Sequence, residues 1–255
     1  MVFVLIPLLF LSRDLVISTF FIILHYYKAL EQEKLYKGLT DIVNKTKNLE
    51  NRLDDYSTDK IDVLKYEDIY KQNDDMVGWI KIEGTKINYP VMQTIEHPDF
   101  YLKHGFDKSY SDYGCPYIQA NCDVKKPSDN LIIYGHNMKD GSMFAGLIKF
   151  QDISFWEKHK TISFDTPAGS GVYEIVAVFK TVVYTSDTDS FKYYNFIDAT
   201  NEAEFNEYIE KCKKLALYDT KVAAKYGDKL ITLSTCEYSK TNGRLVVVAK
   251  RVPHT

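Results

Sequence analysis

The alternation of apolar and polar positions in the C-terminal part of the chain predicts short β-strands. The clearest case is "LITLSTCEYSKTNGRLVVVAKRV" at 230–252, where two apolar runs flank a polar stretch that closes on Asn242-Gly243. Apolar runs joined by such a turn signal are typical of a β-hairpin. The same pattern predicts further strands within 78–93, on either side of a turn at Gly84-Thr85, and at 117–120, 130–134, 161–165 and 173–184.

These strands indicate a mainly β fold with flanking helices. Gly and Pro separate the strands and no helical pattern alternates with them, which favours a barrel or sandwich over a parallel sheet with crossover helices. Two helices interrupt the strands, a short one at 142–150 and a longer one at 202–217 that follows a cap region at Asp198 and Thr200. The longer helix precedes the 229–236 strand, and its Cys212 is expected in the core.

The N-terminal part has a different pattern. Residues 1–27 are mostly apolar, with Arg13 and Asp14 as their fixed charges, and as a helix residues 2–27 would extend about 39 Å, enough for a bilayer. No small-residue cleavage site follows, so the pattern predicts a retained membrane anchor rather than a signal peptide. Residues 28–75 read as a helical lead that packs on the body or acts as a spacer, with a helix at 61–71. Residues 76–255 then form the main domain.

Composition excludes some classes of partner. A net charge of −3 and 26% charged residues provide no basic field, so a nucleic-acid partner is not expected. The four cysteines have no zinc-ligand spacing, and no metal or other cofactor is predicted. A disulfide between Cys115 and Cys122 is sterically possible, but two reduced core cysteines are favoured. The 20 tyrosines, many of them within the predicted strands, fit a β-rich body.

Three residues have the chemistry for cysteine catalysis. Cys236 ends one strand of the predicted hairpin and Arg244 begins the next, so both lie at its turn end. His136 follows the apolar strand in "NLIIYGHNM", at a loop position held by a rigid edge. A thiolate attacks, an imidazole donates a proton to the leaving group, and a guanidinium holds the developing oxyanion. The residues alone also allow an ordinary hairpin with a buried cysteine.

The joint occurrence of several motifs resembles the sortases, the cysteine transpeptidases of Gram-positive cell surfaces. The motifs are "TLSTC" followed by "RLVVVAKRV", with "YGHNM" upstream and an apolar N-terminus. The segment "DDMVGWIKIEGTKINYPVMQ", the helical lead before it and the helix ahead of the cysteine strand point to class B. The resemblance covers about residues 60–253. It implies a closed eight-stranded sortase-type β-barrel with N-terminal helices and one helix inserted before the cysteine strand.

The resemblance also implies residue roles and partners. Cys236 would form a thioacyl intermediate with the sorting signal of a secreted surface protein, with His136 as proton donor and acceptor and Arg244 at the oxyanion. Ser234 and Glu237 would lie in the substrate groove, and the loop at 184–196 would roof it. Peptidoglycan or its lipid-linked precursor would supply the acceptor amine. The protein would sit at the cell membrane with its catalytic domain outside the cytoplasm.

Two alternatives remain at this stage. A cysteine peptidase would use the same three residues with water in place of the amine. A non-catalytic surface-binding barrel would carry Cys236, His136 and Arg244 incidentally, and its Cys236 would not react with thiol alkylators.

Overall fold

A computed structural model describes residues 5–50, 66–167, 169–183 and 191–253. The chain divides into two compact units, Met1–Ile42 and Val43–Thr255. The described part of the first unit is helical and belongs to helix α1 (Leu5–Glu50), which ends eight residues beyond Ile42. Large apolar side chains between Leu15 and Leu24 are exposed on α1. Within the described residues, no helix has the length and apolar character needed to cross a membrane.

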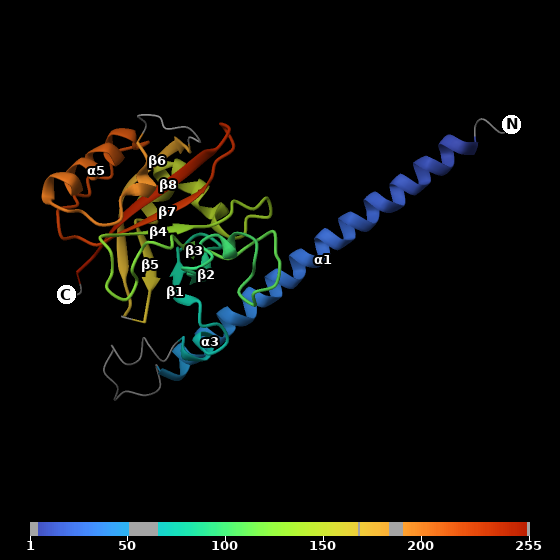
Figure 1. Cartoon of the computed structure of the whole chain (residues 1–255), viewed down its shortest axis with the longest axis horizontal. Coiled ribbons are helices and arrows are strands. Elements are labelled where there is room, and N and C mark those ends of the chain that lie inside the picture. Colours follow the sequence, from blue (N-terminus) through green and yellow to red (C-terminus); the bar gives the residue numbers. More distant parts are fainter. Residues whose placement is uncertain (1–4, 51–65, 168, 184–190, 254–255) are drawn as a thin grey trace. The chain divides into compact units, whose positions relative to one another are not determined.

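The second unit is built on a closed eight-stranded β-barrel (Figure 1), as expected. Its strands follow the order β1-β2-β3-β4-β7-β8-β6-β5, and pairing between β1 and β5 closes the barrel. Their bounds are β1 (Met76–Lys81), β2 (Asn88–Met92), β3 (Tyr117–Ile118), β4 (Asn130–Tyr134), β5 (Thr161–Asp165), β6 (Val172–Val182), β7 (Leu230–Cys236) and β8 (Gly243–Arg251).

Strand order brings distant parts of the sequence together at one end of the barrel. Strand β4 pairs parallel with β7, and β7 pairs antiparallel with β8 as the predicted hairpin. Parallel neighbours end at the same edge, so the C-terminal ends of β4 and β7 lie side by side, next to the start of β8. Strands β2 and β3 form the other parallel pair.

The helices differ in part from the predicted ones. The predicted helix at 142–150 is a 3-10 helix, η2 (Phe144–Gln151), followed by α4 (Ile153–Lys158), which the sequence analysis did not predict. The predicted helix at 61–71 appears as α3 (Glu67–Tyr70), and residues 61–65 lie outside the described residues. The predicted helix at 202–217 is α5 (Glu202–Leu215). Two short 3-10 helices, η1 (Phe100–Leu102) and η3 (Tyr193–Asn195), complete the set.

Helix α5 begins at an Asn201 N-cap and covers the outside of the barrel. The Asn201 side chain accepts a hydrogen bond from the Glu204 backbone N–H at 3.1 Å, and Glu204 accepts in return from the Thr200 N–H at 2.9 Å. Its buried face packs in one cluster with β6, β7 and β8 residues such as Phe179 and Val246. Strand β8 is consequently buried on both faces, which explains its unbroken apolar run.

Candidate active site

The hairpin of β7 and β8 sets the first two predicted site residues opposite each other. Cys236 and Arg244 are paired in the strand register, as expected for the turn end. The Glu237 backbone N–H donates to the Gly243 carbonyl at 2.9 Å, and a Cβ at Gly243 would lie 2.3 Å from the Glu237 carbonyl oxygen. Asn242 adopts φ +56°, a left-handed conformation that asparagine tolerates. The Asn-Gly pair therefore closes the turn that holds the thiol beside the guanidinium.

The end of β4 brings the histidine to the same place. Tyr134 pairs with Ser234, and beyond it the Gly135 N–H donates to the Ser234 carbonyl at 3.2 Å. The Thr235 hydroxyl donates back to the Gly135 carbonyl at 2.8 Å. These bonds extend the pairing of the two strand ends by one residue, so His136 emerges next to Cys236.

A cavity of about 100 Å³ lies at this end of the barrel. It is too small for a whole peptide and suits the reacting carbonyl group and its immediate neighbours. Cys236, His136, Arg244 and Ser234 all line it, together with Leu102, Cys115, Tyr117, Tyr134, Gly135 and Thr235. The structure thus brings four of the five predicted site residues to one cavity. The cavity forms only when the barrel is closed, so the sequence alone does not reveal it.

Arg244 provides the fixed positive charge of the cavity, and two buried tyrosines lie close to it. Burial raises the pKa of Tyr117 far above its ordinary value. It also raises the pKa of Tyr193, which contacts Ser234, to about 12. The positive charge of Arg244 opposes both shifts. Both hydroxyls therefore stay protonated at neutral pH. Of the described residues that line the cavity, Arg244 carries the fixed charge, and it has no carboxylate partner among them. A guanidinium in this setting can receive a developing oxyanion.

A hydrogen bond to a backbone carbonyl determines which ring nitrogen of His136 carries the proton. Nε2 lies 2.8 Å from the backbone carbonyl oxygen of Leu102. A carbonyl oxygen can only accept, so in this geometry Nε2 carries the proton. The other nitrogen, Nδ1, is then the one that remains for proton exchange with a thiol or a leaving amine.

The two predicted substrate-binding residues are placed differently. Ser234 lines the cavity, is buried, and its hydroxyl lies 2.7 Å from the Tyr193 hydroxyl. Glu237 is not among the lining residues, and its side chain is 11% exposed. Its carboxylate accepts hydrogen bonds from the Ser239 hydroxyl at 2.5 Å and backbone N–H at 3.2 Å, and pairs with Lys180 at 3.3 Å. Glu237 therefore stabilises the turn in this structure.

Replacing Glu237 with glutamine is expected to lower the free energy of unfolding by up to about 1 kcal/mol at pH 7, and by less in acid. The Ser239 hydrogen bond, and then Lys180, holds the pKa of Glu237 below its ordinary value of 4.5. A depressed folded-state pKa gives stability that is present above the unfolded pKa and disappears as the pH falls through the folded pKa. Urea unfolding at pH 7 and pH 3 measures the difference.

The control for this prediction is Glu210→Gln, at an exposed position of α5, which should unfold like the wild type at both pH values. Wild-type stability of Glu237→Gln at pH 7, combined with reduced peptide cleavage, would contradict the assignment to the turn. That result would instead support a role for Glu237 in the substrate groove.

Several residues that hold the loops of the site together were not predicted from the sequence. The Asn137 side chain donates to the Cys236 carbonyl at 2.8 Å, and the Tyr238 hydroxyl donates to the Asn137 carbonyl at 3.0 Å. Both bonds tie the loop after β4 to the end of β7. Asn137 directly follows the histidine in "YGHNM", and this proximity was the one signal that could have identified it. The Leu102 carbonyl has no comparable signal.

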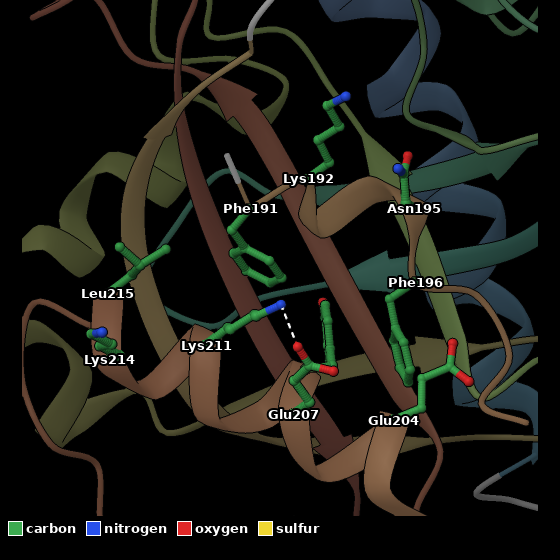
Figure 2. A pocket seen from close by; sticks show the side chains of 10 residues that line it. Phe191, Lys192, Asn195, Phe196, Glu204, Glu207, Lys211, Lys214 and Leu215 are labelled. Carbon is green, nitrogen blue, oxygen red and sulfur yellow. Dashed lines mark ion pairs between the residues drawn. The ribbon is translucent and has the colours of Figure 1, made fainter. Parts of the chain in front are cut away.

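A second and larger cavity, of about 560 Å³, lies between η3 and α5 (Figure 2). Glu207 and Lys211, one turn apart on α5, form an ion pair at 2.6 Å, and the Lys211 amine lies 5.9 Å from the centre of the Phe191 ring. None of the five predicted site residues lines this cavity. Nor do the described residues contain a group of three or more histidines, cysteines and carboxylates placed to hold a metal ion.

The three cysteines other than Cys236 are buried. Cys115 and Cys122 are buried and are not joined by a disulfide, and Cys212 lies in the core beneath α5. Burial raises the pKa of Cys122 to about 11 and that of Cys212 to about 12, so both remain neutral thiols near pH 7. Cys236 is partly exposed.

Comparisons with known proteins agree with this architecture. A family model described as "Sortase domain" matches residues 80–252. The chain is 35% identical to sortase B of Staphylococcus aureus over 188 residues, which covers 73% of this chain and 74% of that protein. It is 37% identical to sortase B of Listeria monocytogenes over 187 residues, covering 72% and 73% of the two chains.

Solved structures extend the likeness to the fold. A structure titled as a Staphylococcus aureus sortase B–substrate complex superposes with a TM-score of 0.75 at 30% identity, and covers 90% of this chain and 100% of that one. A Bacillus anthracis sortase B structure gives a TM-score of 0.74 at 29% identity, with 90% and 100% coverage. The chain therefore belongs to the sortase family, within class B, and is a sortase-type cysteine transpeptidase.

Proposed function

We propose that this enzyme cleaves a C-terminal sorting signal of secreted surface proteins and transfers them to an amine of peptidoglycan or of its lipid-linked precursor. The observation that carries the proposal is the shared cavity, which is lined by the Cys236 thiol, the His136 imidazole and the Arg244 guanidinium. These groups supply the nucleophile, the proton carrier and the oxyanion partner that acyl transfer to a thiol requires. The similar fold of a Staphylococcus aureus sortase B solved in complex with a substrate supports the proposal.

In the first half-reaction the Cys236 thiolate attacks the carbonyl carbon of the scissile peptide bond. A carbon–sulfur bond forms, and the carbonyl oxygen takes up negative charge opposite the Arg244 guanidinium. The carbon–nitrogen bond then breaks, the departing amine takes a proton from the imidazolium of His136, and a thioester remains on Cys236.

In the second half-reaction the acceptor amine attacks the thioester. Neutral His136 takes the proton that the amine loses, the carbon–sulfur bond breaks, and Cys236 leaves as the thiolate. A new amide bond joins the surface protein to the cell wall. Proton count and charge return to their starting values, so no external cofactor is consumed.

Product analysis with a small library of internally quenched sorting peptides tests this function. We expect cleavage of at least one peptide by the domain from residue 28 onward and, with an added amine that mimics the cell-wall acceptor, a product that contains the amine. Hydrolysis alone at every amine concentration would favour the peptidase alternative. An unreactive Cys236 and no cleavage of any peptide would favour a non-catalytic barrel.

Replacing Arg244 with lysine is expected to lower kcat/KM by about 10²-fold, because lysine keeps the charge but not the planar pair of donors. The cleavage rate of the best library peptide provides the measurement. Arg251→Lys is the matched control: Arg251 lies at the far end of β8 and donates to the Ser170 carbonyl at 3.1 Å. It should cleave within twofold of the wild type. Equal rates for Arg244→Lys and the wild type would remove Arg244 from the reaction.

We also propose that residues 1–27 attach the enzyme to the cell membrane, with the catalytic domain on the outer side. The apolar sequence and the exposed apolar side chains between Leu15 and Leu24 support this. Fractionation of cells that express the full chain tests it. Retention in the membrane pellet after high salt and alkaline carbonate, lost on deletion of residues 1–27, is expected. Release by high salt would contradict an anchor.

A further inference from the structure

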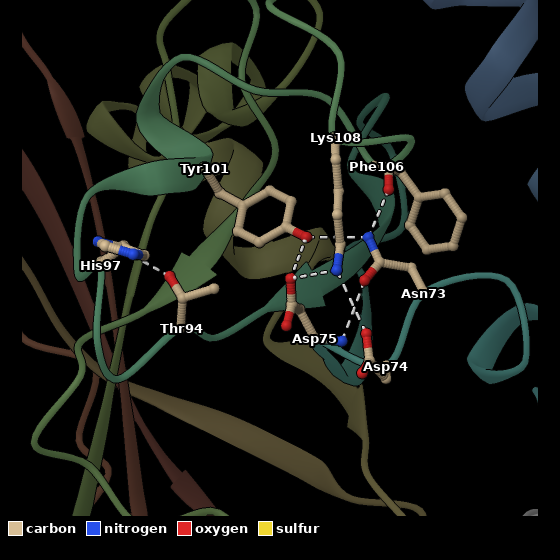
Figure 3. A network of polar contacts seen from close by, with 8 residues as sticks. All are labelled: Asn73, Asp74, Asp75, Thr94, His97, Tyr101, Phe106 and Lys108. Carbon is tan, nitrogen blue, oxygen red and sulfur yellow. Dashed lines mark hydrogen bonds and ion pairs between the residues drawn. The ribbon is translucent and has the colours of Figure 1, made fainter.

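A buried polar network lies outside the catalytic cavity, between the turn that precedes β1 and the loop around η1 (Figure 3). Asn73 is 3% exposed and forms its centre. Its amide nitrogen donates to the Tyr101 hydroxyl at 2.9 Å and to the Phe106 carbonyl at 2.5 Å, and its amide oxygen accepts from the Asp75 N–H at 3.0 Å. Every polar group of this buried side chain is therefore paired across two segments of the chain.

The Tyr101 hydroxyl connects this network to a carboxylate. It accepts from Asn73 and donates to Asp75 Oδ2 at 2.8 Å, and Figure 3 shows it between the two side chains. Burial raises the pKa of Tyr101 far above its ordinary value, so the hydroxyl remains a donor at working pH. The Lys108 amine pairs with Asp75 at 3.0 Å and with Asp74 at 3.2 Å. These ion pairs add a second link between the loop after η1 and the turn before β1.

The backbone next to Tyr101 contacts the catalytic cavity. Leu102, the following residue, offers the carbonyl that accepts the His136 Nε2–H. The Tyr101 carbonyl itself accepts from the Cys115 N–H at 2.9 Å. At Gly114 an added Cβ would lie 2.5 Å from the Tyr101 carbonyl oxygen and 3.2 Å from His136 Cδ2. The imidazole therefore rests against backbone whose position depends on where the Tyr101 side chain is held.

We propose that Tyr101, fixed by Asn73 and Asp75, is a positioning residue that holds the Leu102 carbonyl against His136 and so sets the ring tautomer of that histidine. This inference rests on the proposed catalytic role of His136. The Tyr101 side chain does not line the catalytic cavity, and it acts through the adjoining peptide. With Nε2 held as the donor to Leu102, Nδ1 is the nitrogen that exchanges protons with the thiol and the leaving amine.

The phenylalanine variant of Tyr101 tests the proposal with a readout that does not need turnover. Tyr101→Phe keeps the buried ring and removes the bridging hydroxyl. The ring ¹⁵N chemical shifts of His136 report which nitrogen carries the proton. We expect the Nε2–H form to dominate in the wild type and to lose population in Tyr101→Phe. We also expect kcat to fall about three- to tenfold with KM within twofold, because the catalytic group is displaced and the cavity walls are kept.

Tyr110→Phe is the matched control. Tyr110 lies in the same loop, is 61% exposed, and its hydroxyl donates to Asp112 at 3.0 Å. This variant should keep the His136 shifts and the wild-type kcat.

A pair of variants at Asp75 separates positioning from general loss of stability. Asp75→Ala removes the acceptor for the Tyr101 hydroxyl, whereas Asp75→Asn keeps an oxygen there, and both lose the ion pair with Lys108. We expect Asp75→Ala to reproduce the effects of Tyr101→Phe and Asp75→Asn to recover most of the lost kcat. Wild-type His136 shifts and kcat in a folded Tyr101→Phe would overturn the proposal. Full activity of His136→Ala would instead overturn the proposed function on which it rests.

Discussion

Replacing Cys236 with alanine is expected to reduce peptide cleavage to background, a loss of about 10⁴-fold or more, because it removes the thiol that is proposed to form the thioester. Cys122 and Cys212 are buried and remain neutral thiols. Cys115 is 3% exposed, and its thiol lies 3.6 Å from the Pro90 carbonyl. The initial rate with the best quenched peptide, at equal concentrations of folded protein, measures the effect.

The matched control is Cys122→Ala, which removes a buried thiol away from the catalytic cavity and should cleave at the wild-type rate when folded. Substantial cleavage by Cys236→Ala would mean that the nucleophile is another residue. The thioester mechanism would then be wrong for this chain.

Replacing His136 with alanine is expected to lower kcat by about 10²–10⁴-fold, the range typical of a lost general acid–base. The amine cannot depart efficiently without the proton that His136 donates, and the acceptor amine loses the group that takes its proton. KM should change little, because the imidazole contributes one part of the cavity wall. Steady-state kinetics with the same peptide separates the two constants.

His97→Ala is the control for this variant, since His97 is an exposed loop histidine that does not line the catalytic cavity. It should retain wild-type kinetics. Unchanged kcat in His136→Ala would show that solvent or another group carries the proton, and would leave the imidazole without a role.

Much of the barrel could be predicted from local patterns. The strands β4 and β5 have the predicted bounds, because each is a short apolar or alternating run between polar turns. The 142–150 segment was harder, since its apolar spacing does not distinguish an α-helix from the observed η2. No local sequence pattern predicts the parallel pairing of β4 with β7, because about a hundred residues separate the two strands. This pairing places His136 near Cys236.

The candidate catalytic residues could be picked out from the sequence because their chemistry is rare and because they lie at strand ends, and the structure places all three at one cavity. Their supporting groups could not. The Leu102 carbonyl is a backbone atom, so no side-chain pattern marks it, and its partner His136 is 34 positions away. Asn73 and Tyr101 are common residue types. Their roles depend on a hydrogen bond between two buried side chains that are 28 positions apart in the sequence. Glu237 was expected in the groove from family resemblance, whereas its contacts with Ser239 and Lys180 depend on the turn geometry.

Intact-protein mass spectrometry during the reaction tests the central claim most directly. The enzyme is mixed with an equimolar cleavable peptide without added amine, quenched in acid, and digested to locate any adduct. We expect a mass increase equal to the N-terminal peptide fragment less one water, attached to Cys236 as a thioester, which disappears when an acceptor amine is added and is replaced by the amide product. Cleavage of the peptide with no adduct on Cys236 at any quench time, or an adduct on another residue, would contradict the account.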